Sequence, residues 1–105
     1  MARPPETIRV GPYDIQVDVW TQQQASAAAK FGEFSALELT MRVDGSMPHW
    51  KIVDSLLHEL GHAIWWAYSL QQDDDEERIV ATMALAWTQM YRDTPALVAW
   101  LAEED

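Results

Sequence analysis

The chain has 105 residues, of which 49% are hydrophobic and six are tryptophan, and this composition indicates one folded domain over residues 1–105 with a disordered tail at residues 1–5. Its net charge of −10 argues against nucleic acid or an anionic membrane as a partner, because both would repel the chain. The absence of cysteine excludes disulfides and thiolate metal sites, so any metal must be held by His, Asp or Glu.

Three strands are predicted in the N-terminal half of the chain. Residues 7–10 and 13–20 flank a turn at Gly11, and in the second segment apolar residues occupy every second position. This alternation is typical of a half-buried strand. Residues 21–35 have no clean period, and we expect a loop there with one helical turn at the alanines. Alternation returns in residues 37–43, which predict a third strand.

Helical periodicity replaces alternation in the C-terminal half. We expect a long helix over residues 48–69, a second over residues 74–92 and a short third over residues 95–104. The chain has no repeat and no linker, so these elements predict an α+β fold in which a small antiparallel or mixed sheet packs on the first long helix. No apolar stretch is long enough to span a bilayer, and the N-terminus lacks the apolar core of a signal peptide, so a cytoplasmic location is expected.

The sequence HELGH begins at His58, in the middle of the first long helix. Consecutive helix residues are about 100° apart, so His58 and His62 share one face, away from the apolar stripe that contains Leu56 and Leu60. Glu59 lies beside the pair. This is the arrangement of the H-E-x-x-H motif, in which two imidazoles bind one zinc ion and the acid acts on water. We expect the second long helix to cover this histidine face.

A catalytic zinc site usually has three protein ligands and one open position. The acidic run over residues 73–78 offers the third ligand, although most acids at a helix start serve as caps. Glu77 is favoured, because Ala81 and Ala84 share its side of the helix and would permit a close approach to the histidines. Glu76, which lies towards the more apolar side of the same helix, is the alternative.

The stretch HELGHAI, followed by EERIVATMALA, resembles the gluzincin branch of the zincin metallopeptidases over about residues 37–105. Within that branch the chain is similar to the small ImmA/IrrE-type domains and to zincin-like domains encoded by phages and prophages. The resemblance implies Zn²⁺ bound by His58, His62 and Glu77, with Glu59 as the general base that supports cleavage of a peptide or protein substrate. It also implies that the third predicted strand is the edge along which the substrate lies, and a location in the cytoplasm of a phage-infected or lysogenic bacterium.

Two alternatives to a peptidase follow from the same residues. The domain could be a catalytically inactive zincin-like module that binds metal and serves a structural or protein-interaction role, because so short a chain leaves little wall for a cleft. It could also be a helical core without metal. His49 is interpreted as a surface or capping residue. Tyr91 is the candidate for stabilising the transition state, since it falls on the Glu77 side of its helix. Trp65, Trp66 and Trp87 are interpreted as core residues, with a surface for a partner as the alternative.

Overall fold

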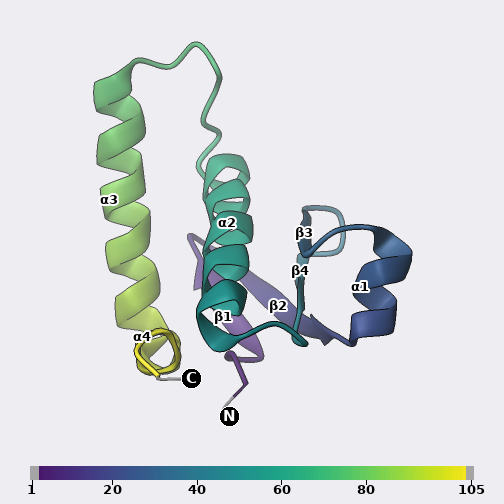
Figure 1. Ribbon diagram of the computed structural model, residues 1–105. Helices are drawn as coiled ribbons and strands as arrows, with labels where there is room; N and C mark the ends of the chain where they lie inside the picture. The colour runs from purple at the N-terminus through teal and green to yellow at the C-terminus, as the bar shows by residue number, and fades with distance from the viewer. Residues whose placement is uncertain (1–2, 104–105) are drawn as a thin grey trace.

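A four-stranded sheet occupies the N-terminal half of the protein, and three of its helices follow the last strand (Figure 1). The computed structural model describes residues 3–103. The elements in chain order are β1 (Thr7–Val10), β2 (Tyr13–Trp20), α1 (Gln22–Ala28), β3 (Gly32–Ser35), β4 (Thr40–Asp44), α2 (His49–Ala67), α3 (Glu76–Asp93) and α4 (Pro95–Leu101). The predicted α+β class is confirmed.

The sheet is mixed, with strand order β1-β2-β4-β3. The central strands β2 and β4 are parallel, whereas β1 and β3 pair antiparallel to them at the two edges. A parallel pair needs a long crossover connection, and here α1 and β3 lie within it. The segments before β1 and after α4 that the structure describes carry no helix or strand, and residues 1–2 of the expected tail lie outside the described residues.

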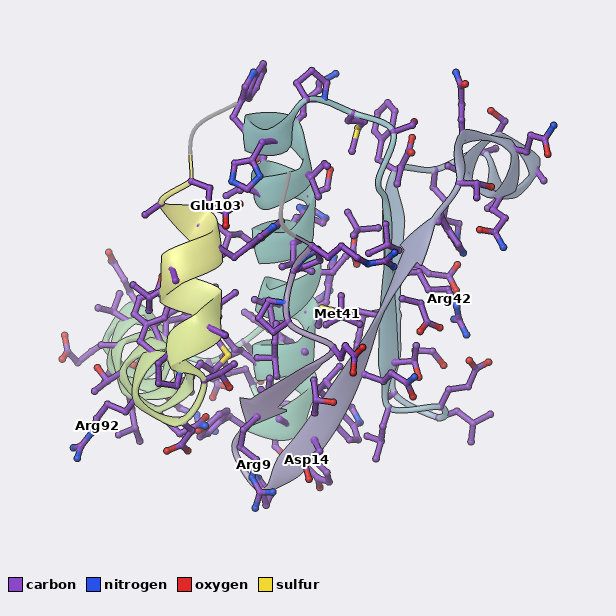
Figure 2. The ribbon with its side chains drawn as sticks, turned by 90° about the horizontal axis from the view of Figure 1, so that it is seen from below. Arg9, Asp14, Met41, Arg42, Arg92 and Glu103 are labelled. Carbon is purple, nitrogen blue, oxygen red and sulfur yellow. The ribbon has the colours of Figure 1, made fainter. Side chains whose placement is uncertain are left out.

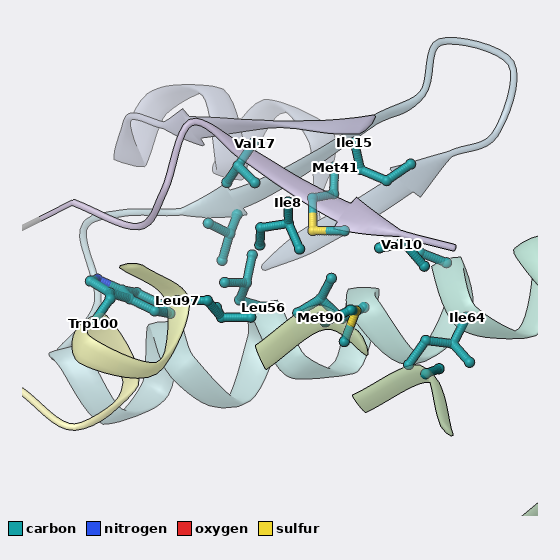
Figure 3. Close-up of a cluster of buried hydrophobic side chains, with 14 of the residues drawn as sticks. Ile8, Val10, Ile15, Val17, Met41, Leu56, Ile64, Met90, Leu97 and Trp100 are labelled. Atoms are coloured by element: carbon teal, nitrogen blue, oxygen red, sulfur yellow. The ribbon is translucent and has the colours of Figure 1, made fainter. Parts of the chain in front are cut away.

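The core lies between one face of the sheet and the helices α2, α3 and α4 (Figure 3). The alternating pattern of β2 is confirmed, since Ile15 and Val17 face this core. In α2 the predicted apolar stripe is also buried, with Leu56 and Leu60 completely covered. The other fully buried apolar side chains are Ile8, Val10, Met41, Val43, Ala63, Ile64, Ala86, Met90 and Leu97.

Helix α3 is fixed to the β1–β2 turn through its C-terminal half. The Gln89 side chain accepts a hydrogen bond from the Gly11 N–H at 2.8 Å and donates one to the Arg9 carbonyl oxygen at 2.9 Å. Met90, one residue further on, is completely buried. The first turns of α3 instead extend beyond the end of α2 (Figure 1). The second long helix therefore covers the β1 side of the sheet.

Two predicted segments differ from the structure. In residues 21–35 the expected helical turn at the alanines is the longer helix α1, which Thr21 caps through a reciprocal bond with Gln24, and part of the expected loop is the strand β3. The third predicted strand begins later than expected, because Leu37 is 96% exposed and Leu39 adopts a left-handed φ of 50° in the turn before β4. Strand β4 also lies inside the sheet and not at its edge, so the expected substrate edge at residues 37–43 is wrong.

The tryptophans of the two long helices lie in different environments. Trp87 packs against the core, as predicted, and Trp65 is half-buried. Trp66 is 38% exposed, so its interpretation as a core residue is wrong.

The predicted third helix ends at Leu101, and its expected last residue lies outside the described part of the chain. Over residues 3–103, no helix combines the length and the apolar character that crossing a membrane requires.

Candidate metal centre

The two histidines of the HELGH sequence converge on one point. The Nε2 atoms of His58 and His62 are 3.2 Å apart, and the ring planes are inclined by 77° with their centroids 4.9 Å apart. Both side chains are exposed, because they project from α2 on the side away from Leu56 and Leu60. The spacing of four residues along the helix therefore produces a pair of nitrogen atoms open to solvent.

The separation of these nitrogens fits two ligands of a single zinc ion. Zn–N bonds of about 2.0–2.1 Å at a tetrahedral angle would hold two nitrogens about 3.3 Å apart. The Nε2 atoms of His58 and His62, at 3.2 Å, are within hydrogen-bonding distance of each other and also have about that spacing. Within residues 3–103, however, no group of three or more His, Cys, Asp and Glu side chains gathers closely enough to hold a metal. The pair thus provides two ligands, and a third ligand has to reach it from elsewhere.

Glu59 lies next to the pair and is held between α2 and the sheet. Only 8% of the residue is exposed, although it is an acid. The β3 residue Gly32 makes this position possible, since a Cβ atom on Gly32 would lie 3.4 Å from Glu59 Oε2 and only 2.8 Å from the Arg42 carbonyl oxygen. The absence of a side chain at Gly32 lets the edge strand pass directly over the carboxyl group.

A groove separates β3 from the histidine face of α2. It has a volume of about 550 Å³ and is lined by Gly32 and Phe34 from the strand and by His58, Glu59 and His62 from the helix, among others. The Asp44 N–H donates a hydrogen bond to the Phe31 carbonyl oxygen at 2.8 Å. In an antiparallel pair such as β3 and β4, every second residue of a strand bonds to the partner strand in this way, counted here from Phe31. In that alternation the N–H and C=O groups of Gly32 and Phe34 point towards the free edge of β3.

The outer face of the sheet braces this edge strand. Arg42 of β4 projects away from the core, on the side opposite Met41 (Figure 2), and its guanidinium donates to Glu33 of β3 at 2.8 Å. A second hydrogen bond joins Arg42 to Glu38 in the β3–β4 turn. The bonds to Glu38 and Glu33 raise the pKa of Arg42 above its ordinary value, although partial burial opposes them. Arg42 therefore stays charged, and it ties β3 to β4 and to the turn between them through these two acids.

The opposite side of the histidine pair faces α3 across a second groove of about 540 Å³. Gly61 and Met83 help to line this groove, and a Cβ atom on Gly61 would have no neighbour within 4 Å. Ala81 and Ala84, the small residues expected to contact α2, are both exposed. The expected close approach of the two long helices through these alanines is therefore wrong, because the Gln89 anchor positions α3 against β1.

The acids at the start of α3 are exposed or engaged in capping. Asp75 is the N-cap residue and accepts from the Arg78 N–H at 2.8 Å, whereas Asp74 accepts from the Gln71 N–H and pairs with the Arg78 side chain. Glu76 and Glu77 are both exposed. The structure thus brings His58, Glu59 and His62 together and leaves Glu77 and Glu76 apart from them.

Two further residues lie away from the histidine groove. His49 is 3% exposed, and its ring packs edge-on against Trp100 of α4 with centroids 5.0 Å apart, so its interpretation as a surface or capping residue is wrong. Tyr91 packs against Trp87 in the C-terminal half of α3, with centroids 5.8 Å apart. Neither residue lines the groove that contains His58 and Glu59.

The contribution of β3 to the site was missed from the sequence. Gly32 and Phe34 lie in a four-residue strand whose members are all half-buried, so the segment has no alternation of apolar and polar residues. An isolated glycine between two phenylalanines is nevertheless a signal of a close backbone approach.

Comparison of the chain with protein-family models, curated proteins and solved structures finds no match.

Proposed function

We propose that this chain is a zinc-dependent metallopeptidase in which His58 and His62 bind the metal and Glu59 is the general base. The observation that carries this proposal is the 3.2 Å separation of the two Nε2 atoms, which fits zinc, with the sheltered Glu59 carboxyl beside them. The groove along β3 supports a peptide as substrate, because an extended chain can hydrogen-bond to the outward N–H and C=O groups of Gly32 and Phe34.

A bound zinc ion supplies Lewis acidity and makes water acidic enough to act as a nucleophile near neutral pH. Glu59 takes the proton of the attacking water and delivers it to the departing amine, so that its carboxyl group alternates between base and acid. Its position under Gly32 fixes the carboxyl group and limits its hydration. The edge strand orients the peptide, which removes part of the entropic cost of bringing the scissile bond to the histidines.

The third ligand requires a movement in the segment that joins α2 to α3. Glu76 lies seven residues before Met83 on the same face of α3, which corresponds to about 10 Å along the helix axis and exceeds the reach of its side chain. Glu77 lies about 100° from Glu76 around the helix axis, so its side chain projects away from the face that carries Met83. Gln72 already lines the groove beside both histidines, so its neighbour Asp73 needs the smallest displacement. Asp73 therefore joins Glu76 and Glu77 as a candidate.

The alternative function is a metal-binding module without catalytic activity that serves a structural or interaction role. The observation that favours it is the lack of a third ligand near the exposed histidine pair within the described residues. An inactive module would bind zinc through two histidines and a solvent or partner ligand, and would not need the Glu59 carboxyl.

A peptidase assay with the full chain separates the two functions. The protein is loaded with zinc and incubated with an unfolded and a native protein substrate, with and without a chelator, and new amino termini are counted. The metallopeptidase predicts cleavage that the chelator stops and that zinc restores. Zinc binding without any cleavage would support the inactive module.

A further inference from the structure

An aromatic platform lies at one end of the groove along β3. The indole of Trp66 packs against Tyr13 of β2, with ring centroids 4.6 Å apart, and against Phe34 of β3, with centroids 5.9 Å apart. Side chains from two strands thus hold the indole in place, yet Trp66 remains 38% exposed. A large apolar surface that is fixed in position and open to solvent is characteristic of a binding site more than of a core.

The platform is continuous with the histidine site. Trp66 and Phe34 line the same groove as His58, Glu59 and His62. Phe34 also belongs to the strand whose outward N–H and C=O groups can pair with an extended peptide. In an extended chain, successive side chains alternate sides with a rise of about 3.3 Å per residue. A peptide held along β3 therefore presents one of its side chains to Trp66 while its backbone passes the histidines.

The charge around the groove selects among such peptides. Its lining includes Glu59, and a contiguous pocket of about 310 Å³ beside His58 adds Asp54. The third acid, Glu33, already pairs with Arg42 at 2.8 Å and with Lys30, the one cationic residue of this lining, at 3.4 Å. The whole chain carries a net charge of −10. The net negative charge of the chain, together with the carboxylates of Glu59 and Asp54, therefore favours a peptide with positive charge.

We propose that the groove binds an extended cationic peptide segment and that Trp66 is the specificity-determining residue, which receives a large apolar side chain of that segment. The proposal rests on the proposed function for the position of the scissile bond, next to the residue seated on Trp66. Peptide binding itself needs only the edge of β3, the aromatic platform and the acidic lining.

The test measures binding to the chelator-treated chain, in which Glu59 is intact, and to the zinc-loaded Glu59→Gln variant, so that cleavage does not consume the probe. Fluorescence polarisation is recorded with the fluorescein-labelled peptide Gly-Lys-Gly-Phe-Gly-Lys-Gly and with two relatives, in which Ala replaces Phe or Glu replaces both Lys. Each peptide is titrated with zinc-loaded and with chelator-treated protein. We expect each replacement to weaken binding by about tenfold, since a buried aromatic contact and a matched charge are each of that order.

Matched tryptophan variants locate the contact. Trp66→Ala should weaken binding of the Phe peptide by about tenfold, and Trp66→Phe should restore most of it, because a phenyl ring keeps the aromatic surface. Trp50→Ala is the control, since Trp50 is 62% exposed at the start of α2, and we expect a change of less than about twofold for an exposed side chain outside the contact. Circular dichroism establishes that each variant is folded.

The proposal is overturned if none of the peptides binds, if the Ala peptide binds as tightly as the Phe peptide, or if a folded Trp66→Ala variant binds as the parent does. The peptide comparison decides the question even where Trp66→Ala does not fold. Failure of the proposed function has a different signature: zinc does not bind, or the native chain does not cleave these peptides, while the preference for Phe and Lys persists in the chelator-treated protein.

Discussion

The two sides of the histidine pair differ in how completely they are assembled. On the β3 side, Gly32 covers the carboxyl group of Glu59, and Arg42 ties the edge strand to its neighbour. On the α3 side, Gly61 faces open space and the first turns of α3 extend past the end of α2 (Figure 1). The proposed base and the proposed peptide edge are thus held in place, whereas the proposed third ligand would come from a segment that precedes the first core contact of α3, at Met83.

This difference separates two requirements of a metallopeptidase. Preorganised hydrogen bonds and a fixed base lower the barrier of a reaction because they need no rearrangement during it. A ligand carried by a movable segment instead couples metal binding to the closure of that segment. We therefore expect changes on the β3 side to affect catalysis and stability, and changes on the α3 side to affect metal affinity.

Glu59→Gln should have the largest effect of any single change on the β3 side. A neutral amide cannot accept the proton of water, so kcat/KM should fall by about 10²–10⁴-fold, the usual contribution of a general base. Zinc content should not change, because the variant keeps both imidazoles. Steady-state assays with the zinc-loaded variant measure the fall, and an undiminished kcat/KM would remove Glu59 as the base.

Substitution of two methionines of α3 compares its anchored and its extended halves. Met90 is completely buried, so Met90→Ala should lower the free energy of unfolding by about 2–5 kcal/mol through the cavity it leaves. Met83 is half-buried beside the open groove, and Met83→Ala should cost about 1 kcal/mol or less. Urea unfolding followed by tryptophan fluorescence gives both values, and equal losses would contradict the comparison.

Gly32→Ala should disturb the edge strand and the base together. The new methyl group would meet the Arg42 carbonyl oxygen at 2.8 Å, and such overpacking typically costs about 1–3 kcal/mol of stability. Because Glu59 lies directly beneath Gly32, kcat/KM should fall as well. Thermal unfolding measures the loss of stability, and the peptidase assay measures the fall in kcat/KM. If β3 can shift freely to accept the methyl group, neither quantity will change.

Gly61→Ala is the matched change on the other side, and we expect the smallest effect from it. A Cβ atom there meets nothing within 4 Å, and alanine stabilises the middle of a helix by about 0.5–1 kcal/mol relative to glycine. For a domain of this size the gain corresponds to a rise in Tm of about 2–8 °C. A lower Tm would instead indicate that α3 or another group fills this space in solution.

Much of the fold could be predicted because its patterns are local. The alternation in β2 and the apolar stripe of α2 each report a buried face directly. Helix α1 was predicted as a single turn because only Ala25 is buried and no apolar stripe exists, although Thr21 followed by Gln24 is a capping-box pattern. The spacing of His58 and His62 likewise predicted their convergence, since both belong to one helix.

The distance of Glu77 from the histidine pair could not be predicted because it depends on contacts between distant segments. The position of α3 depends on the buried Ala86 and Met90 and on Gln89, which bonds to residues 78 and 80 positions earlier in the chain. The helical position of Glu77 does not contain that information. The same limit applies to Trp66, whose neighbours Tyr13 and Phe34 come from two different strands.

Zinc binding by the histidine pair is the central claim, and a titration tests it most directly. The full chain, its Glu59→Gln variant, and the His58→Ala and His62→Ala variants are titrated with zinc against a chromophoric chelator, and bound zinc is counted by elemental analysis. We predict one zinc per chain in the first two proteins and a loss of binding in both histidine variants, with a lower stability of the metal-free forms. A parent protein that holds no zinc, or histidine variants that hold as much zinc as the parent, would contradict the claim.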